Sequence, residues 1–132
     1  HRVANYWTKE KLGFSMYIQS IVSEKFNVDI HPNAEIGKGI MIDHASGVVI
    51  GQTAKVGDFC SIFHGVTLGG IGAEKGQRHP QVGKNVLLSA NSTIVGNIKI
   101  GDNTKIGAGS VVLNDIPKDS TAVGVPAKVI NN

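Results

Sequence analysis

A six-residue repeat limits the possible folds of this chain more than any other feature of its sequence. Aliphatic side chains recur every six residues, in three blocks, from residue 30 to residue 112. A period of six fits neither the 3.6-residue turn of an α-helix nor the two-residue alternation of a long strand. It fits a short strand followed by a turn, repeated many times. The blocks are Ile30, Ile36 and Ile42; Ile50, Val56, Ile62 and Leu68; and Val82, Leu88, Ile94, Ile100, Ile106 and Val112.

Two further positions of the repeat are also restricted. Glycine often follows the aliphatic residue, as at Gly57 and Gly83, and the position four residues after it is mostly small or β-branched. We expect the aliphatic side chain to point into a common interior and the glycine to adopt a backbone conformation closed to most residues. Three units make one triangular coil, and stacked coils bury a continuous core. The thirteen units therefore predict an all-β fold, a parallel β-helix of about four coils.

The segments on either side of the repeat follow other patterns. Five apolar residues between positions 14 and 22 have helical spacing and predict a short amphipathic helix that covers the open end of the coil. Residues 2–11 are a candidate for a second helix. Two prolines after residue 112 break the repeat and indicate a closing segment. We expect residues 1–27 to form a short helical segment and residues 28–132 to form the β-helix domain.

Composition argues against several classes of protein. The net charge is +3, and lysine and arginine are scattered rather than arranged in a stripe, so we expect no nucleic-acid partner. The sequence contains no apolar run long enough to span a membrane and nothing that resembles a signal peptide, so we expect no membrane association. The single cysteine, Cys60, excludes an internal disulfide and fits a reducing, cytoplasmic location.

The repeat is interrupted twice, and titratable side chains gather at both interruptions. Eight residues rather than six separate the aliphatic positions 42 and 50, and fourteen rather than twelve separate positions 68 and 82. Each interruption predicts a surface loop, and loops on a rigid scaffold often hold catalytic groups. The titratable side chains are Asp43 and His44 in the first loop, Arg78 and His79 in the second, and Asp29 just upstream of the first.

Each of these side chains also has an ordinary explanation. A lone surface histidine is usually just solvated, and an Asp-His pair in a loop can cap a turn through its side chain. Arg78 is one of several cations that could simply be solvated. The coincidence of the titratable residues with both interruptions favours the functional interpretation.

Four segments together resemble the serine O-acetyltransferases of the hexapeptide-repeat acyltransferase superfamily. They are "DIHPNAEIGKGIMIDHASGVVIG", "GVTLGGIG", "RHPQVG" and "IGAGSVVL…VGVPAKVI", and the resemblance runs from "HRVANYW" to "GVPAKVI". It implies a left-handed parallel β-helix that assembles as a homotrimer, able to pair as a dimer of trimers, with residues 1–27 the end of a helical N-terminal domain. The implied reaction moves the acetyl group of acetyl-CoA to the hydroxyl of L-serine, giving O-acetyl-L-serine for cysteine biosynthesis.

Acetyl transfer from a thioester to a hydroxyl needs a base, donors for the oxyanion and an acceptor held in line. Histidine suits the first task because its pKa lies near working pH. The resemblance implies that His44 is the base and that Asp29 is its carboxylate partner, which fixes the tautomer and stabilises the imidazolium. The hydroxyl attacks directly, so Cys60 has no catalytic task and we interpret it as core packing.

The same resemblance implies which residues hold the two substrates. Asp43 meets the ammonium of L-serine, the Arg78 guanidinium forks around the carboxylate, and His79 lies at the same site. Acetyl-CoA lies along the groove between neighbouring coils, where small side chains allow close access to the backbone, although such residues also suit ordinary turns of the repeat. These small residues are Gly70, Ala90 and Ala108. No metal ion is expected.

Three features depart from the family pattern. Gln52 stands where the family commonly has an acidic residue, so one charge of the site is missing. Only the last helices of the N-terminal domain precede the repeat. The chain ends in "KVINN", without the terminal isoleucine through which many members bind O-acetylserine sulfhydrylase, so we do not expect that docking.

Three alternatives fit parts of the pattern. An O-acetyltransferase of sugar or antibiotic hydroxyls would use the same base and differ at the acceptor, where "QRHP" and Asp43 favour an amino acid. Zinc carbonic anhydrases also form β-helical trimers, but two of their histidine ligands are closely spaced, whereas those at positions 31, 44, 64 and 79 are at least thirteen residues apart. A catalytically inactive scaffold is supported only by Gln52.

Overall fold

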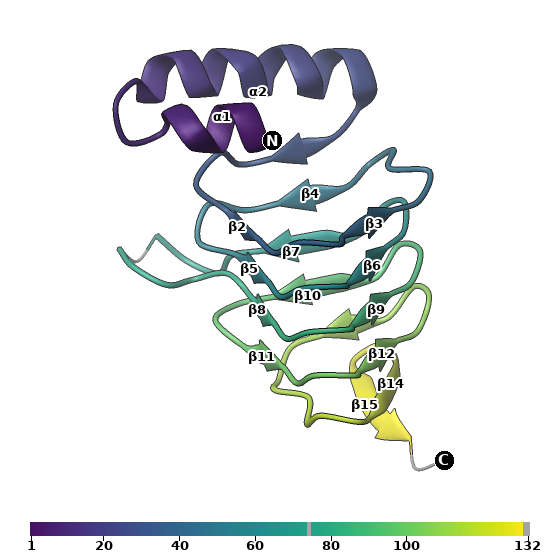
Figure 1. Ribbon diagram of the computed structural model, residues 1–132. Helices are drawn as coiled ribbons and strands as arrows, with labels where there is room; N and C mark the ends of the chain where they lie inside the picture. The colour runs from purple at the N-terminus through teal and green to yellow at the C-terminus, as the bar shows by residue number, and fades with distance from the viewer. Residues whose placement is uncertain (74, 131–132) are drawn as a thin grey trace.

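The computed structural model describes residues 1–73 and 75–130, which form a stack of triangular coils with two helices across one end (Figure 1). Helices α1 (Arg2–Trp7) and α2 (Leu12–Phe26) lie at the N-terminal end, and the C-terminus lies at the opposite end. Helix α2 packs against the first strand and ends at Asn27, whose φ of 54° is left-handed. Within the described residues, neither helix has the length and apolar character needed to cross a membrane.

Successive strands join three sheets in turn. In chain order the strands are β1 (Asp29–Ile30), β2 (Glu35–Ile36), β3 (Met41–Ile42), β4 (Val49–Ile50), β5 (Lys55–Val56), β6 (Ser61–Ile62), β7 (Thr67–Gly69), β8 (Gln81–Val82), β9 (Leu87–Leu88), β10 (Thr93–Val95), β11 (Lys99–Ile100), β12 (Lys105–Ile106), β13 (Val111–Val112), β14 (Thr121–Gly124) and β15 (Ala127–Ile130). Sheet A has the order β1-β4-β7-β10-β13, sheet B the order β2-β5-β8-β11, and sheet C the order β3-β6-β9-β12-β14-β15.

Nearly all strand pairs in these sheets are parallel, so the predicted parallel β-helix is confirmed. The exception is β14 with β15, an antiparallel hairpin that forms the closing segment expected after residue 112. The last two residues of "KVINN", on which the docking expectation depends, lie outside the described residues.

The aliphatic repeat positions form three stacks inside the coil. In sheet A, the parallel register aligns Ile50, Leu68 and Ile94. From Ile50 onward every aliphatic repeat position is at most 4% exposed. The first coil differs, since Ile42 is 37% exposed and the other two positions are half-buried. Helix α2 packs on β1 of sheet A, and the sheet C side of this coil is less covered.

The glycines that follow the aliphatic residues have a different purpose from the one expected. Gly57 and Gly83 do not have a positive φ. A Cβ added at Gly83 would lie 2.3 Å from Asp102 Oδ1 and 2.9 Å from the Asp102 backbone nitrogen. The requirement is therefore space, because the turn of the next coil passes directly over the glycine. At the corner between sheets B and C, the left-handed positions belong to Gly39, Phe59, Asn85, Asn103 and Asp119.

The second interruption of the repeat differs from its expected form. The spacing of fourteen residues was interpreted as two repeat units and two additional residues. In the structure the strand after β7 is β8, so a longer loop that includes residues 70–73 and 75–80 stands in place of a single turn. This loop extends away from the stack (Figure 1). The first interruption, residues 43–48, joins β3 to β4 as expected.

The amphipathic helix predicted over residues 14–22 is part of α2, but its apolar side chains point in two directions. Ile18 and Val22 are half-buried and line a cavity of about 100 Å³ between the helices and the first coil. Phe14 and Tyr17 are 48% and 63% exposed. The helix thus covers the end of the coil with one side and leaves an apolar side uncovered in the described part of the chain.

The core stacks predict that two adjacent leucines of β9 contribute very differently to the free energy of unfolding. Leu88 is fully buried in the sheet C stack, whereas Leu87 faces outward and is half-exposed. We expect Leu88→Ala to lower the free energy of unfolding by about 2–5 kcal/mol, since it leaves a cavity between coils. Leu87→Ala is the matched control and should cost less than about 1 kcal/mol. Urea unfolding monitored by circular dichroism measures both, and equal losses would contradict this assignment of the core.

Candidate active site

Apart from Asp29, which lies in strand β1, the predicted site residues lie at two corners of the triangular coil, one at each edge of sheet A. The C–A corner, where the chain passes from sheet C to sheet A, contains Asp43, His44, Ser46, His64, Ala90 and Ala108. The A–B corner, where the chain passes from sheet A to sheet B, contains His31, Gln52, Thr53, Gly70, Gln77, Arg78 and His79. Within one chain, the proposed base and the proposed carboxylate-binding residues therefore lie at opposite edges of the same sheet.

Backbone hydrogen bonds align successive turns of the C–A corner in a column. The N–H of Gly65 donates to Ser46 O, that of Asn91 to His64 O and that of Gly109 to Ala90 O, each at 2.9 Å. Ala90 and the residue before Gly109, Ala108, therefore lie in line with His64 along the coil. The two small residues predicted to border acetyl-CoA share a corner with the proposed base.

The loop that presents His44 has an unusual backbone. His44 and the following Ala45 both have left-handed φ values, 61° and 55°, which cost energy for residues with a Cβ. The His44 side chain is 72% exposed, and its Nε2 lies 3.8 Å from Asp43 Oδ2. Its ring also lies 5.8 Å from the His64 ring in an edge-on arrangement. The backbone conformation thus directs an imidazole into solvent beside a carboxylate and a second imidazole.

Asp29 is the first residue of β1, and helix α2 binds its carboxylate. Its Oδ1 accepts a hydrogen bond from Gln19 Nε2 of α2. Within the described residues, Asp29 makes no ion pair with His44, which pairs with Asp43 instead. Burial lowers the pKa of His31, the Asp29 carboxylate opposes that shift, and the charge of Arg78 adds to it. Asp29 is therefore held by α2 and acts electrostatically on the A–B corner.

Thr53 is the centre of the A–B corner. Its Oγ1 lies 2.8 Å from His79 Nδ1 and accepts hydrogen bonds from the backbone N–H groups of Arg78 and His79, at 3.1 and 3.2 Å. Gln77 Nε2 donates to Thr53 O at 2.6 Å and to His79 O at 2.7 Å. These contacts attach the end of the long loop to the turn between β4 and β5.

Two glycines make room for the His79 ring, which is only 6% exposed. A Cβ added at Gly51 would lie 2.0 Å from His79 Nε2, and one added at Gly70 would lie 3.0 Å from it. Gly70 therefore borders His79 at the A–B corner, while Ala90 and Ala108 lie at the C–A corner. The three residues predicted to border acetyl-CoA are not brought together within one chain.

Burial lowers the pKa of His79 below its ordinary value, and the positive charges of Arg78 and His31 lower it further. Arg78 is half-buried as a residue, and its guanidinium Nη1 lies 3.4 Å from Gly72 O at an exposed position. A hollow of about 500 Å³ beside it is lined by Gln52, Thr53, Ala73, Lys75, Gly76 and Arg78. The corner offers a cation, a neutral imidazole and space for a small polar ligand.

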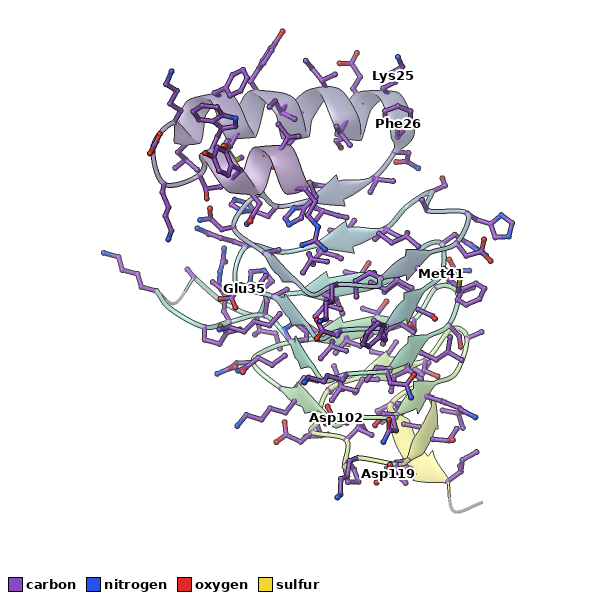
Figure 2. The ribbon with its side chains drawn as sticks, in the orientation of Figure 1. Lys25, Phe26, Glu35, Met41, Asp102 and Asp119 are labelled. Carbon is purple, nitrogen blue, oxygen red and sulfur yellow. The ribbon has the colours of Figure 1, made fainter. Side chains whose placement is uncertain are left out.

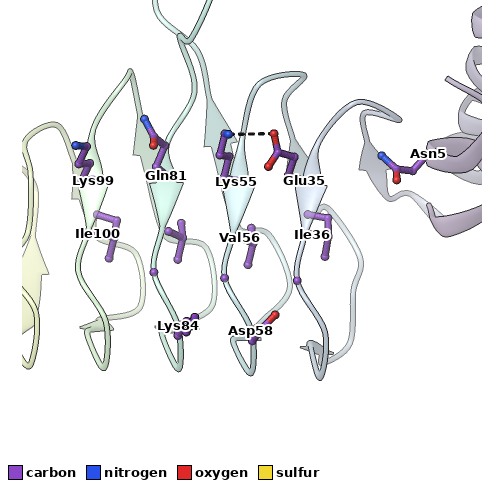
Figure 3. A pocket seen from close by; sticks show the side chains of 14 residues that line it. Asn5, Glu35, Ile36, Lys55, Val56, Asp58, Gln81, Lys84, Lys99 and Ile100 are labelled. Atoms are coloured by element: carbon purple, nitrogen blue, oxygen red, sulfur yellow. Dashed lines mark ion pairs between the residues drawn. The ribbon is translucent and has the colours of Figure 1, made fainter. Parts of the chain in front are cut away.

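A larger hollow, of about 670 Å³, lies on the outer face of sheet B (Figure 3). Figure 3 shows Glu35, Lys55, Gln81 and Lys99 in one row across it, with Glu35 and Lys55 joined by an ion pair of 3.0 Å. None of the predicted site residues lines this hollow, so volume alone does not locate the chemistry. Glu35 and Met41 lie on opposite sides of the first coil (Figure 2).

The described residues contain no group of three or more histidine, cysteine or acidic side chains placed to hold a metal ion.

Sequence reasoning did not identify Thr53 or Gln19. Parallel pairing of Lys55 with Gln81 brings "GQTA" beside "RHP", and no spacing along the chain indicates that contact. Gln19 reaches Asp29 only because α2 folds back over β1. The sequence assigns no role to His64, and its position in the column beneath Ser46 explains its proximity to His44.

Known proteins share both the fold and much of the sequence. A family model described as bacterial transferase hexapeptide (six repeats) matches residues 79–114. A curated serine acetyltransferase of Synechococcus elongatus is 51% identical over 131 residues, which are 98% of this chain and 54% of that protein. The chain spans about half the length of the curated relatives it matches.

Two solved structures of serine acetyltransferases contain ligands and superpose closely on this chain. One, from Neisseria gonorrhoeae in complex with serine, is 49% identical with a TM-score of 0.96, over 99% of this chain and 54% of that one. The other, from Brucella abortus strain S19 in complex with coenzyme A, is also 49% identical with a TM-score of 0.96, over 98% of this chain and 52% of that one.

The lowered pKa of His79 predicts a pH-dependent stability. In the unfolded chain His79 binds a proton near pH 6.5, whereas in the folded chain its pKa is lower. The contribution of the neutral His79 ring to the free energy of unfolding is therefore complete above about pH 6.5 and is lost as the pH falls through the folded pKa. We expect the temperature at the midpoint of thermal unfolding to be lower at pH 5.5 than at pH 7.5. The His79→Gln variant should show a smaller difference between these two pH values. His44→Gln is the matched control, since its exposed ring is hydrated in both states. An unchanged difference in His79→Gln would contradict the prediction.

Proposed function

The chain belongs to the serine acetyltransferases, as their hexapeptide-repeat domain, and on this premise we propose that it transfers the acetyl group of acetyl-CoA to the hydroxyl of L-serine. The observation that carries the proposal is the placement of a presented imidazole and a carboxylate-binding pair at the two edges of sheet A. Neighbouring copies would supply the two halves of each site. The similar structures with bound serine and bound coenzyme A support the choice of substrates.

The surface of sheet A supports a homotrimer. Outward positions along β4 to β13 of this sheet are uncharged, whereas sheet B presents charged and amide side chains at its equivalent positions. The sheet A residues are Val49, Thr67, Thr93 and Val111; the sheet B residues are Glu35, Lys55, Gln81 and Lys99. If three copies turn sheet A toward a common axis, the C–A corner of each copy meets the A–B corner of the next. Each junction then contains a complete set of site residues.

In the proposed reaction, His44 accepts the proton of the serine hydroxyl as its oxygen attacks the thioester carbonyl carbon. The tetrahedral intermediate collapses, the carbon–sulfur bond breaks, and the CoA thiolate takes the proton back from His44. Asp29 would stabilise the imidazolium after the exposed His44 ring turns from Asp43 toward sheet A. Gln19 occupies one carboxylate oxygen of Asp29 and leaves the other for the imidazole.

Substrate binding would follow from the two corners. Asp43 meets the ammonium of serine, while Arg78 and His79 of the adjoining copy hold its carboxylate. Acetyl-CoA lies along the column that contains Ala90 and Ala108, where the side chains do not extend beyond Cβ. Gly70 would border the same ligand from the neighbouring copy. Gln52 lines the hollow beside Arg78. The missing acidic charge would therefore affect binding of the acceptor and not the action of the base.

Other properties of the whole protein belong to the same proposal. Residues 1–27 would be the end of a helical N-terminal domain, because the exposed apolar side of α2 needs a partner, and two trimers would pair through that domain. A reducing compartment such as the cytoplasm suits Cys60, whose buried thiol contacts Gly83 O at 3.1 Å. O-acetylserine sulfhydrylase is not proposed as a partner.

The direct test is release of CoA thiol from acetyl-CoA in the presence of L-serine. We expect turnover with serine and a fall of about 10²–10⁴-fold in kcat for His44→Ala, since general-base assistance is lost. Lys105→Ala, an exposed change on sheet C, is the control and should leave kcat unchanged. Turnover only with sugar or aminoglycoside acceptors would support the alternative acetyltransferase and overturn serine as substrate.

A further inference from the structure

The hydrogen bonds around Thr53 determine where its hydroxyl proton points. A threonine hydroxyl has one hydrogen and two lone pairs. The backbone N–H groups of Arg78 and His79 donate to Thr53 Oγ1 at 3.1 and 3.2 Å and occupy both lone pairs. The remaining close partner is His79 Nδ1 at 2.8 Å. The hydroxyl therefore donates to Nδ1, and the Thr53 backbone N–H donates to the same atom at 3.3 Å.

This arrangement fixes the tautomer of His79. A ring nitrogen that accepts two hydrogen bonds has no proton of its own, so the proton of the neutral imidazole is on Nε2. Protonation of Nδ1 would oppose the two donors of Thr53, in a ring that is only 6% exposed. Burial and the charges of Arg78 and His31 lower the pKa of His79 in the same direction. The ring is thus a neutral donor at pH 7 and does not serve as a base through Nε2.

The Nε2–H is available to a ligand. Within the described residues it makes no hydrogen bond, and Nε2 is absent from the buried polar atoms without a partner, so it retains access to solvent. It borders Gly70, where an added Cβ would lie 3.0 Å away. Arg78 precedes it in the chain, so a guanidinium and a neutral N–H donor are presented at the same corner.

We propose that Thr53 is a positioning residue that fixes His79 as the Nε2–H tautomer, and that this N–H donates to the carboxylate of the acceptor amino acid beside Arg78. The proposal deepens the serine acetyltransferase function and rests on it, because it explains how His79 is kept as a hydrogen-bond donor for the carboxylate that the proposed function assigns to it. Thr53 itself does not touch the substrate. Its effect on catalysis is transmitted through the protonation pattern and orientation of one imidazole.

The first measurement is the tautomer of His79 in the unmodified protein. Nitrogen-15 NMR of histidine-labelled protein distinguishes the two neutral tautomers and the imidazolium, and His79→Gln assigns the signal by removing it. We expect the Nε2–H tautomer at pH 7.5. An Nδ1–H tautomer, or a charged ring at that pH, would overturn the proposal, and this result does not depend on the folding of any Thr53 variant.

Substitution of Thr53 tests the link to the substrate. Thr53→Val keeps the β-branched shape and removes the hydroxyl, so we expect a mixture of tautomers and a rise of about tenfold in KM for L-serine. The KM for acetyl-CoA and kcat should change little. Thr53→Ser keeps the hydroxyl and should restore both the tautomer and the KM.

Thr104→Val is the matched control. It removes a buried threonine hydroxyl that donates to Pro117 O at 3.1 Å, at the corner between sheets B and C, and it should move neither the His79 signal nor the serine KM. A double variant, Thr53→Val with His79→Gln, adds a second test. If Thr53 acts through the imidazole, its substitution should not raise the serine KM further once that ring is replaced.

Each outcome decides a different part of the proposal. A changed tautomer in Thr53→Val with an unchanged serine KM would overturn the assignment of His79 to the carboxylate. A loss confined to kcat would also overturn it, because that loss would indicate a contact made only in the transition state. A Thr53→Ser variant that behaves like Thr53→Val would overturn the role of the hydroxyl. If the unmodified protein does not turn over serine at all, the proposed function fails, while the NMR result still decides whether Thr53 fixes the tautomer.

Discussion

The register of parallel pairing between successive coils is the constraint on which the rest of this structure depends. Each inward aliphatic side chain sits directly on the equivalent one of the next coil, as Ile62 does on Leu88 in sheet C. An extra residue within a strand would turn that side chain outward and interrupt the stack. Additional residues are tolerated only where the chain turns between sheets, so both loops that interrupt the repeat lie at corners.

Both interruptions of the repeat fall at corners that border sheet A, and the proposed two-part site depends on this placement. The short loop leaves His44 exposed, held by left-handed backbone at His44 and Ala45. The long loop is anchored at its end by Thr53 and Gln77, so His79 is buried and fixed. One corner presents an exposed imidazole and the other a buried, hydrogen-bonded one, and the proposed trimer would bring them together.

The sequence predicted the coil well because its signal is repeated thirteen times and each unit contacts only its neighbours. The sequence-based explanation of the glycines, a special backbone conformation, was wrong. Glycine is needed at Gly83 because the next coil approaches closely there, and not because of its local φ. Asp43, His44, Arg78 and His79 are candidates for the site because the two interruptions of the repeat mark them. Thr53 and Gln19 act through contacts between distant segments, which no local pattern encodes. The separation of the two corners likewise requires the three-dimensional coil.

The claim that each site is shared between copies can be tested by mixing two inactive variants. His44→Ala lacks the base at the C–A corner, and Arg78→Ala lacks the carboxylate-binding cation at the A–B corner. When the two are unfolded together and reassembled at equal amounts, one junction in each mixed trimer regains both residues, so we predict recovery of about a quarter of the unmodified turnover. A mixture of His44→Ala with Asp43→Ala, altered at the same corner, should recover none. Absence of recovery in the first mixture would contradict the shared site and place the chemistry within one chain.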